Sequence, residues 1–241
     1  MDVIDALEAR RGVTCVVGAG GKKTTMATVA GRLDRAVVTA TVRIPIFDSW
    51  VDRVVVTDDP LAAVESADER PLGVVPERER PDRYLGYDLE TVDDLADCRD
   101  PVLVKADGAR MREFKAPDDR EPQIPSSADT VVPIASAHVV GEPLDDERVH
   151  RVDRVSALTG RDPGDELRPA DVAAVLASED GGRKGVPDGA TVVPLINMVD
   201  DDDLEATARE VAAEVLARAD VPRVVLAEMR SDDPLVGVVE D

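Results

Sequence analysis

Glycines, lysines and threonines crowd the segment 18–25, which directly follows an apolar run at residues 13–17. Glycine permits positive φ and lets backbone N–H groups approach an anion closely. A helix that begins here would direct its unpaired N–H groups and the positive end of its dipole at the same anion. Lys22 or Lys23 would neutralise phosphate charge, and Thr24 or Thr25 would hold a magnesium ion. The sequence therefore predicts a phosphate-binding loop made of Gly18, Ala19, Gly20, Gly21, Lys22, Lys23, Thr24 and Thr25.

The spacing of this loop differs from the usual G-x-x-x-x-G-K-[ST] pattern, because position 16 is Val and a second lysine precedes Thr24. Which of the two lysines contacts phosphate is therefore open. A dinucleotide-binding G-x-G-x-x-G pattern fits worse, since its third glycine would fall at Lys23. The alternative is an ordinary glycine-rich turn. Two adjacent lysines at a helix N-terminus oppose the dipole unless an anion is present, which favours anion binding.

A second set of polar residues follows the apolar run at 101–106. Asp107 ends this expected strand, where a carboxylate beside a phosphate loop can hold magnesium; the alternative is an Asp-Gly turn. The proline-punctuated segment 112–125 comes next. In it, Lys115 or Arg120 would stabilise developing charge and Glu121 would position an attacking group, unless the segment is a solvated loop.

Two further strand ends carry polar groups. Threonine hydroxyl groups and the cation of Arg43 end the run at 37–43, a position that suits a ligand contact. The alternative is simply a strand rich in threonine. Asn197 and Asp200 end another run with the spacing of the N-K-x-D element that reads guanine, although Met198 replaces the lysine. The alternative is that both residues cap local structure.

Elements that would position these groups alternate along the chain. Short Val-rich runs at 13–17, 36–41, 53–57, 101–106, 130–134, 191–196 and 222–227 predict strands. Helical patterns are expected at 26–33, 149–158, 169–177 and 202–217. This alternation predicts an α/β fold with a mainly parallel sheet and helices on both faces. We expect one domain over residues 1–241, with a surface excursion around 70–90.

The composition sets limits on partners and location. Acidic residues number 51 against 29 basic ones, giving a formal charge of −22. Such a surface suits a high-salt cytoplasm and disfavours nucleic acid and anionic membranes as partners. No apolar run approaches the length of a membrane span, and the N-terminus does not have the pattern of a signal peptide, so we expect a cytoplasmic protein. Only five residues are lysines, and four of them lie in the two segments singled out above.

These motifs together resemble those of the selenium-dependent molybdenum-hydroxylase accessory proteins of the YqeC type. The resemblance rests on the G-A-G-G-K loop, the A-D-G element at 106–108, the K-A-P…E-P-x-I-P segment at 115–125, the stretch 141–151 and the N-x-x-D strand end at 197–200. It covers nearly the whole chain. Lys105 departs from the family, which usually has Glu there; Arg120 and Met198 also differ.

The resemblance implies a P-loop-NTPase-like protein that takes part in selenium cofactor biosynthesis or in maturation of a molybdenum hydroxylase. We expect it to bind Mg²⁺ with ATP or GTP and to meet the hydroxylase or its cofactor-assembly proteins. Lys22, Lys23, Asp107, Lys115 and Glu121 are the candidate catalytic residues, and Thr24 and Asp107 the candidate metal ligands. The alternatives are a small-molecule kinase or transferase, and a protein that senses a nucleotide or cofactor without turnover.

The charge predicts that stability depends on salt. The free energy of unfolding should rise between 0.1 and 2 M KCl, because the screening length falls from about 10 Å at 0.1 M to about 3 Å at 1 M. Urea titrations at each salt concentration measure it. Sucrose at matched osmolality is the control, and an equal gain in sucrose would contradict the electrostatic explanation.

Overall fold

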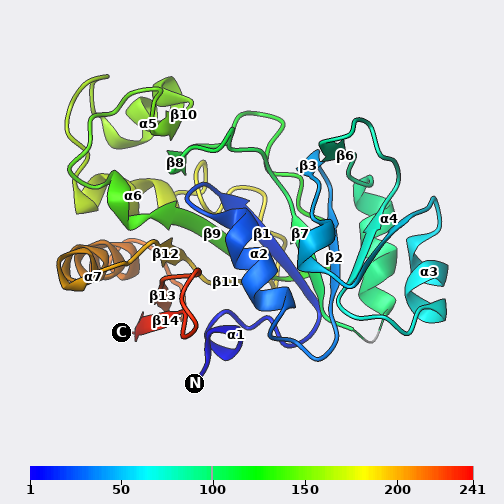
Figure 1. Cartoon of the computed structure of the whole chain (residues 1–241). Coiled ribbons are helices and arrows are strands. Elements are labelled where there is room, and N and C mark those ends of the chain that lie inside the picture. Colours follow the sequence, from blue (N-terminus) through cyan, green and yellow to red (C-terminus); the bar gives the residue numbers. More distant parts are fainter. Residues whose placement is uncertain (99, 241) are drawn as a thin grey trace.

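The computed structural model describes residues 1–98 and 100–240. Its centre is a sheet with the strand order β14-β13-β12-β9-β1-β7-β2-β5-β4, and β11 pairs with β9 beside this path (Figure 1). Every pairing is parallel except that of β13 with β14. The carboxyl ends of the parallel strands therefore meet at one edge of the sheet. The predicted α/β fold with a mainly parallel sheet is confirmed.

The strands of the main sheet are β1 (Val13–Gly18), β2 (Val37–Ala40), β4 (Arg53–Val56), β5 (Leu72–Val75), β7 (Val102–Lys105), β9 (Ala128–Ser136), β11 (Thr191–Val192), β12 (Leu195–Asn197), β13 (Val224–Ala227) and β14 (Leu235–Val239). Two short pairs lie outside it: β3 (Ile44–Pro45) with β6 (Arg83–Tyr84), and β8 (Phe114–Lys115) with β10 (Val149–His150). The helices are α1 (Val3–Ala6), α2 (Lys22–Ala30), α3 (Pro60–Ser66), α4 (Leu89–Asp94), α5 (Val152–Thr159), α6 (Pro169–Ala177) and α7 (Asp202–Leu216).

Helices cover both faces of the sheet, as expected. Helices α1 and α2 pack on one face, where Met26 and Val29 meet strand residues such as Val16 and Leu103. The opposite face is covered by α3 and α4 over one half and by α6 and α7 over the other. Because central parallel strands bury both faces, their residues are apolar without alternation, which explains the Val-rich runs.

Three expected elements differ from the structure. The run at 191–196 is split into β11 and β12 by residues 193–194, because Pro194 lacks the N–H that a continuous ladder needs. Residues 149–150 form a strand, so the expected helix begins only at Val152. The excursion expected around 70–90 is wrong for Leu72–Val75, which form the buried strand β5 between β2 and β4. Charged and proline residues on both sides concealed this short strand.

None of the helices in the described residues is long and apolar enough to cross a membrane.

Glycines of the loop after β1 are required by packing. At Gly20, φ is +91°, and a Cβ atom would lie 2.4 Å from Ser136 N and 2.8 Å from Glu113 O. Gly20→Ala therefore combines left-handed strain with a backbone clash. Gly160 offers the matched control, because its φ is +72° but no atom lies within 4 Å of the added Cβ.

We expect Gly160→Ala to cost about 1–2 kcal/mol of unfolding free energy, the strain of the left-handed backbone alone. Gly20→Ala should cost clearly more, because the strands at the carboxyl edge must also separate. Urea unfolding of both variants in the same buffer measures the difference. Equal losses would contradict the close packing of this loop.

Candidate functional site

The helix after the loop begins at Lys22, four residues before the start that the apolar pattern indicated. Gly21 is its N-cap, with φ +115°, and no side chain caps it. The N–H groups of Lys22, Lys23 and Thr24 therefore have no partner within the helix. An uncapped helix N-terminus of this kind can bind an anion through its donors and its dipole.

The N–H groups of Gly18, Ala19 and Gly20 are used inside the protein. Gly18 N donates to Asp107 Oδ2 at 2.8 Å. Ala19 N donates to Ile134 O, and Gly20 N donates to Arg112 O. Of the predicted loop residues, Ala19 and Gly20 thus do not present their N–H groups to a ligand in this conformation. The donors left for an anion are those at the start of α2.

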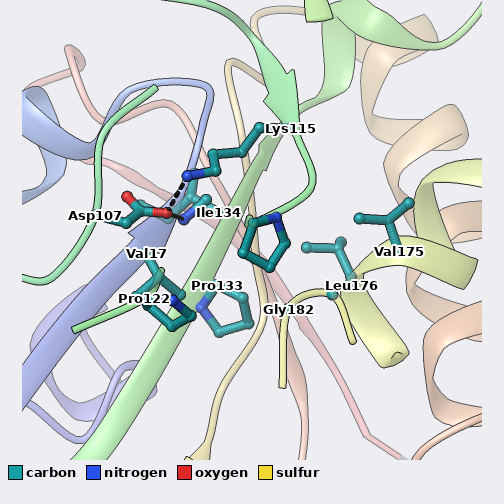
Figure 2. A pocket seen from close by; sticks show the side chains of 12 residues that line it. Val17, Asp107, Lys115, Pro122, Pro133, Ile134, Val175, Leu176 and Gly182 are labelled. Atoms are coloured by element: carbon teal, nitrogen blue, oxygen red, sulfur yellow. Dashed lines mark hydrogen bonds and ion pairs between the residues drawn. The ribbon is translucent and has the colours of Figure 1, made fainter. Parts of the chain in front are cut away.

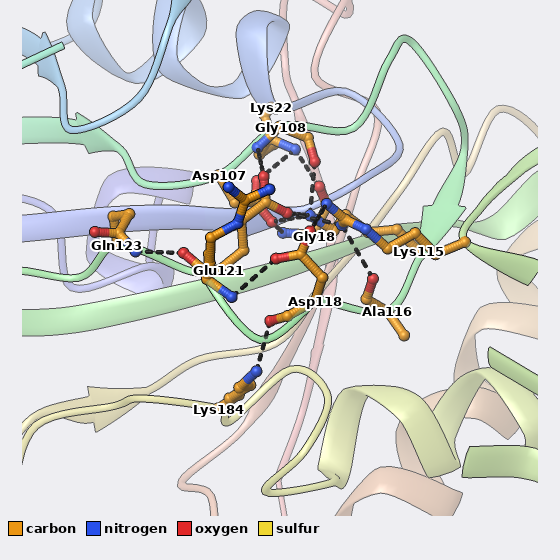
Figure 3. Close-up of polar contacts among 12 residues, drawn as sticks. Gly18, Lys22, Asp107, Gly108, Lys115, Ala116, Asp118, Glu121, Gln123 and Lys184 are labelled. Carbon is orange, nitrogen blue, oxygen red and sulfur yellow. Dashed lines mark hydrogen bonds and ion pairs between the residues drawn. The ribbon is translucent and has the colours of Figure 1, made fainter. Parts of the chain in front are cut away.

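Asp107 lies between two lysines, each from a different segment (Figure 3). Its Oδ1 is 2.8 Å from Lys22 Nζ, and its Oδ2 is 2.8 Å from Lys115 Nζ. All three side chains are at most 5% exposed. Lys22 Nζ also donates to Gly18 O. The structure thus identifies Lys22 as the lysine that points into the cluster, whereas Lys23 is half-buried on the neighbouring helix position.

Glu121 extends this cluster. Its Oε2 accepts from Lys115 Nζ at 2.7 Å, and its Oε1 accepts from Gly108 N at 3.2 Å. Lys115 Nζ also donates to Gly108 O at 2.6 Å. All three Lys115 donors therefore have acceptors, and the lysine is fixed. The predicted residues Lys22, Asp107, Lys115 and Glu121 meet in one network.

Arg151 holds the loop around Lys115 from outside. Its guanidinium lies 2.7 Å from Glu121 Oε2 and 2.7 Å from Asp118 Oδ2. Arg151 lies at the turn between β10 and α5 and has φ +67°. This value is uncommon for residues other than glycine. That turn directs the side chain back onto the loop. Reasoning from the sequence missed Arg151, although it ends the stretch 141–151.

Lys184 was the one lysine that the sequence left outside the candidate segments. In the structure its Nζ donates to Asp118 O at 2.6 Å, on the same loop. All five lysines therefore gather at the carboxyl edge of the sheet. The scarcity of lysine was the signal that could have identified Lys184.

Burial and neighbouring charges shift the ionisation of the cluster. Burial by itself raises the pKa of Asp107, but the ammonium groups of Lys22 and Lys115 outweigh it, so the pKa lies below its ordinary value. Burial lowers the pKa of Lys22, and Asp107 opposes this shift. Burial raises the pKa of Glu121, and Lys115 and Arg151 bring it below its ordinary value. Both acids are therefore carboxylates at neutral pH, so Glu121 is a weak base here.

Lys105 is a third buried lysine at this edge, 6% exposed at the end of β7. Its Nζ donates to Arg43 O at 2.8 Å. Burial, together with the nearby Lys22, lowers the pKa of Lys105 to about 7.

Asn197 and Asp200 do not form a joint site. Asn197 Nδ2 donates to Gly20 O at 2.8 Å, and its Oδ1 accepts from Met229 N at 3.2 Å. Asp200 instead lies 2.8 Å from His138 Nε2. Asn197 therefore fastens the glycine loop to β12 and β13, and reading a guanine base would require it to give up both bonds.

Asp107 is the carboxylate that could contribute to a magnesium site, and Lys22 would first have to leave its Oδ1. The described residues contain no group of three or more His, Cys, Asp or Glu side chains that could hold a metal. Magnesium in nucleotide sites, however, is usually bound by one or two carboxylates together with phosphate and water. Asp107 Oδ1 is buried and accepts no hydrogen bond of good geometry, although Lys22 Nζ lies near it. Thr24 is half-buried in the first turn of α2, and no hydrogen bond joins it to Asp107 in the described part of the chain.

A cavity of about 20 Å³ lies beside Asp107 and Lys115, on the side of α6 (Figure 2). This volume admits about one water molecule. Its lining is mostly apolar and includes Pro122, Pro133 and Leu176. A nucleotide could not enter a cavity of this size.

Comparison with known proteins identifies the family. The sequence profile of the YqeC protein family matches residues 14–153, more than half of the chain. The chain belongs to the YqeC family. It is also 30% identical over 239 residues to the "Uncharacterized protein YqeC" of Escherichia coli (strain K12), covering 95% of this chain and 92% of that protein. No solved structure matched the chain.

The part of this YqeC-family chain that the profile matches contains most of the cluster: Lys22, Asp107, Lys115, Glu121 and Arg151. Lys184 and Asn197 lie beyond it and belong to the portion aligned with the Escherichia coli relative. The segments that carried the resemblance are thus the ones whose side chains contact one another.

The network predicts that Asp107 is essential for stability. Asp107→Asn leaves Lys22 and Lys115 buried without their shared counterion, so we expect a loss of about 3–5 kcal/mol in the free energy of unfolding at pH 7. Glu205→Gln, which breaks an exposed pair with Arg209, should change it little.

The free energies of unfolding of wild type and Asp107→Asn can also be compared at acid pH. Because the pKa of Asp107 is lowered by folding, its contribution is present above about pH 4, the ordinary carboxyl value, and is lost as pH falls through the lowered value. The difference between wild type and Asp107→Asn should therefore shrink in acid. A difference that is small at pH 7, or that grows as the pH falls, would contradict the buried carboxylate.

Proposed function

We propose that this protein binds Mg²⁺ with ATP or GTP at the carboxyl edge of its sheet, with the phosphates at the N-terminus of α2. The observation that carries the proposal is the excess of buried cations there. Three buried lysines lie at this edge, Lys22, Lys105 and Lys115, and among the described residues only Lys22 and Lys115 form ion pairs with the carboxylates of Asp107 and Glu121. The N-terminus of α2, whose first N–H groups have no partner within the helix, lies at the same edge of the sheet. In a chain of charge −22, such a site suits an anionic ligand.

Binding would require an exchange of partners. Lys22 is held by Asp107 and Gly18 O, and its ammonium would turn from them to phosphate oxygens at the start of α2. That movement would free Oδ1 of Asp107, which with Thr24 would hold the metal, while Oδ2 keeps its contacts with Lys115 and Gly18 N. Bound magnesium would neutralise part of the phosphate charge. Lys23, on the same first turn, would supply a second cation near the phosphates.

Lys115 and Glu121 would act through position. Each donor of Lys115 is already directed at an oxygen, so the lysine keeps a fixed geometry beside Asp107. Glu121 is held by Lys115, Arg151 and Gly108 N. A carboxylate held this way orients its neighbours more readily than it accepts a proton. We therefore assign Glu121 to positioning Lys115, and through it any group that attacks the phosphate.

The cellular role follows from the family resemblance. It implies an accessory protein in maturation of a selenium-dependent molybdenum hydroxylase, and nucleotide binding would order the loop around Lys115 for delivery or assembly of a cofactor. The hydroxylase or its cofactor-assembly proteins would be the partners. Steady hydrolysis of the nucleotide would favour this accessory function. Transfer of phosphate to an acceptor would favour a kinase or transferase, and tight binding without turnover would favour a sensor.

Calorimetric titration of ATP and of GTP with magnesium, in molar KCl, tests the proposal. We expect binding of at least one nucleotide, reduced on the order of tenfold or more in Lys22→Met because a charged contact to phosphate is lost. Arg218→Met removes the same charge from an exposed pair with Glu214 and should bind as wild type does. The affinity of Lys23→Met in the same titration measures what the second of the two adjacent lysines contributes to phosphate binding.

Absence of binding of either nucleotide to folded wild-type protein would refute this function. Binding that survives in Lys22→Met and in Lys23→Met alike would place the nucleotide elsewhere. The preferred base also tests Asn197, since a strong preference for GTP would require the asparagine to leave Gly20 and Met229.

A further inference from the structure

Lys105 differs from the other two buried lysines of the site in what surrounds its ammonium group. Lys22 and Lys115 each lie 2.8 Å from a carboxylate oxygen of Asp107. Lys105 Nζ has one acceptor, the carbonyl of Arg43 at 2.8 Å, and within residues 1–98 and 100–240 no carboxylate oxygen lies within 4 Å of it. An ammonium group carries three donors, so two of them have no acceptor in the described structure.

This arrangement is costly for a side chain that is only 6% exposed. A buried charge normally has a counterion, and a buried donor normally has an acceptor. The chain has 51 acidic residues, yet none of those within residues 1–98 and 100–240 forms an ion pair with Lys105. Asp107 and Glu121 are already shared among Lys22, Lys115 and Arg151. An anion from outside the chain would supply the partner that Lys105 does not find within the described residues.

The position of Lys105 places that anion between two strand ends. Lys105 is paired with Val16 of β1 on one side and Ala40 of β2 on the other. Its ammonium reaches the segment after β2, at Arg43. The start of α2 follows β1 at the same edge of the sheet. An oxyanion at Lys105 would thus lie at the carboxyl edge, on the side of β2.

We propose that Lys105 is the primary oxyanion-binding residue of the resting protein, and that it binds a phosphate-class anion without magnesium. Lys22 and Lys115 must first leave Asp107 before they can contact a ligand, whereas Lys105 has donors ready. The ligand is recognised by its negatively charged oxygens, whether they belong to a nucleotide or to a second, smaller substrate. This inference extends the proposed function, because it concerns the same edge of the sheet, but it does not require a nucleotide or a metal.

Inorganic pyrophosphate is the probe, titrated into the full-length protein by calorimetry with EDTA at fixed KCl concentration. Wild type should bind it, and Lys105→Met should bind it on the order of tenfold more weakly or worse, because a charged hydrogen bond is lost. Lys105→Arg keeps the charge and should restore much of the affinity. Arg209→Met, which removes an exposed cation on α7, is the control and should match wild type.

Thermal unfolding provides a second readout that a purely structural lysine would not give. Lys105→Met removes a buried charge without a counterion, so the ligand-free variant should unfold at the same temperature as wild type or higher. The rise in Tm that pyrophosphate gives wild type should be lost in the variant. Lys105→Gln, which keeps a donor for Arg43 O, serves the same test if Lys105→Met does not fold.

The outcomes separate this inference from the nucleotide proposal. Unchanged pyrophosphate affinity in both Lys105→Met and Lys105→Gln would overturn it, as would wild type that binds Mg-ATP or Mg-GTP but not metal-free pyrophosphate. Wild type that binds pyrophosphate through Lys105 but neither nucleotide would support it and refute the nucleotide proposal. Adenosine in place of pyrophosphate should not bind, and equal binding of adenosine would show that oxyanions are not what is recognised.

Discussion

A single buried carboxylate joins the parts of this site. Asp107 accepts a hydrogen bond from Gly18 N at the end of β1, and its two oxygens form ion pairs with Lys22 on α2 and Lys115 on β8. Burying any one of these charges alone would be expensive, so each segment is held in place by the charge of another. The site therefore forms only when β1, β7 and the loop around Lys115 are all assembled, and the sheet sets its geometry.

The same constraint explains the unusual loop after β1. Its glycines allow the chain to pass close to β9 and to Asn197, where any side chain would collide with backbone or with the amide. Two of its N–H groups serve that packing. The N–H groups left without such a role are those at the start of α2, which would bind the anion under our proposal.

Much of the fold could be read from the sequence, because central parallel strands are apolar on both faces and stand out as Val-rich runs. Strand β5 could not, since four residues between charged and proline neighbours carry too little pattern. The site was predicted where motifs lie next to strands, as for Asp107 and Lys115. Arg151 and Lys184 reach the cluster through tertiary packing of the second half of the chain, which no local pattern records. That Lys22, and not Lys23, points inward depends on where α2 begins.

Lysine is scarce in this protein, and the fold brings every one of its copies to the carboxyl edge of the sheet. Elsewhere the described surface carries its positive charge as guanidinium groups, apart from the terminal amine. Reagents that acylate amines would consequently address the site mainly at the half-buried Lys23 and Lys184, because Lys22, Lys105 and Lys115 are buried. Attachment to a support through amines would in turn obstruct the edge at which ligands are expected. Labelling and immobilisation are therefore better directed at the carboxylates that dominate the surface.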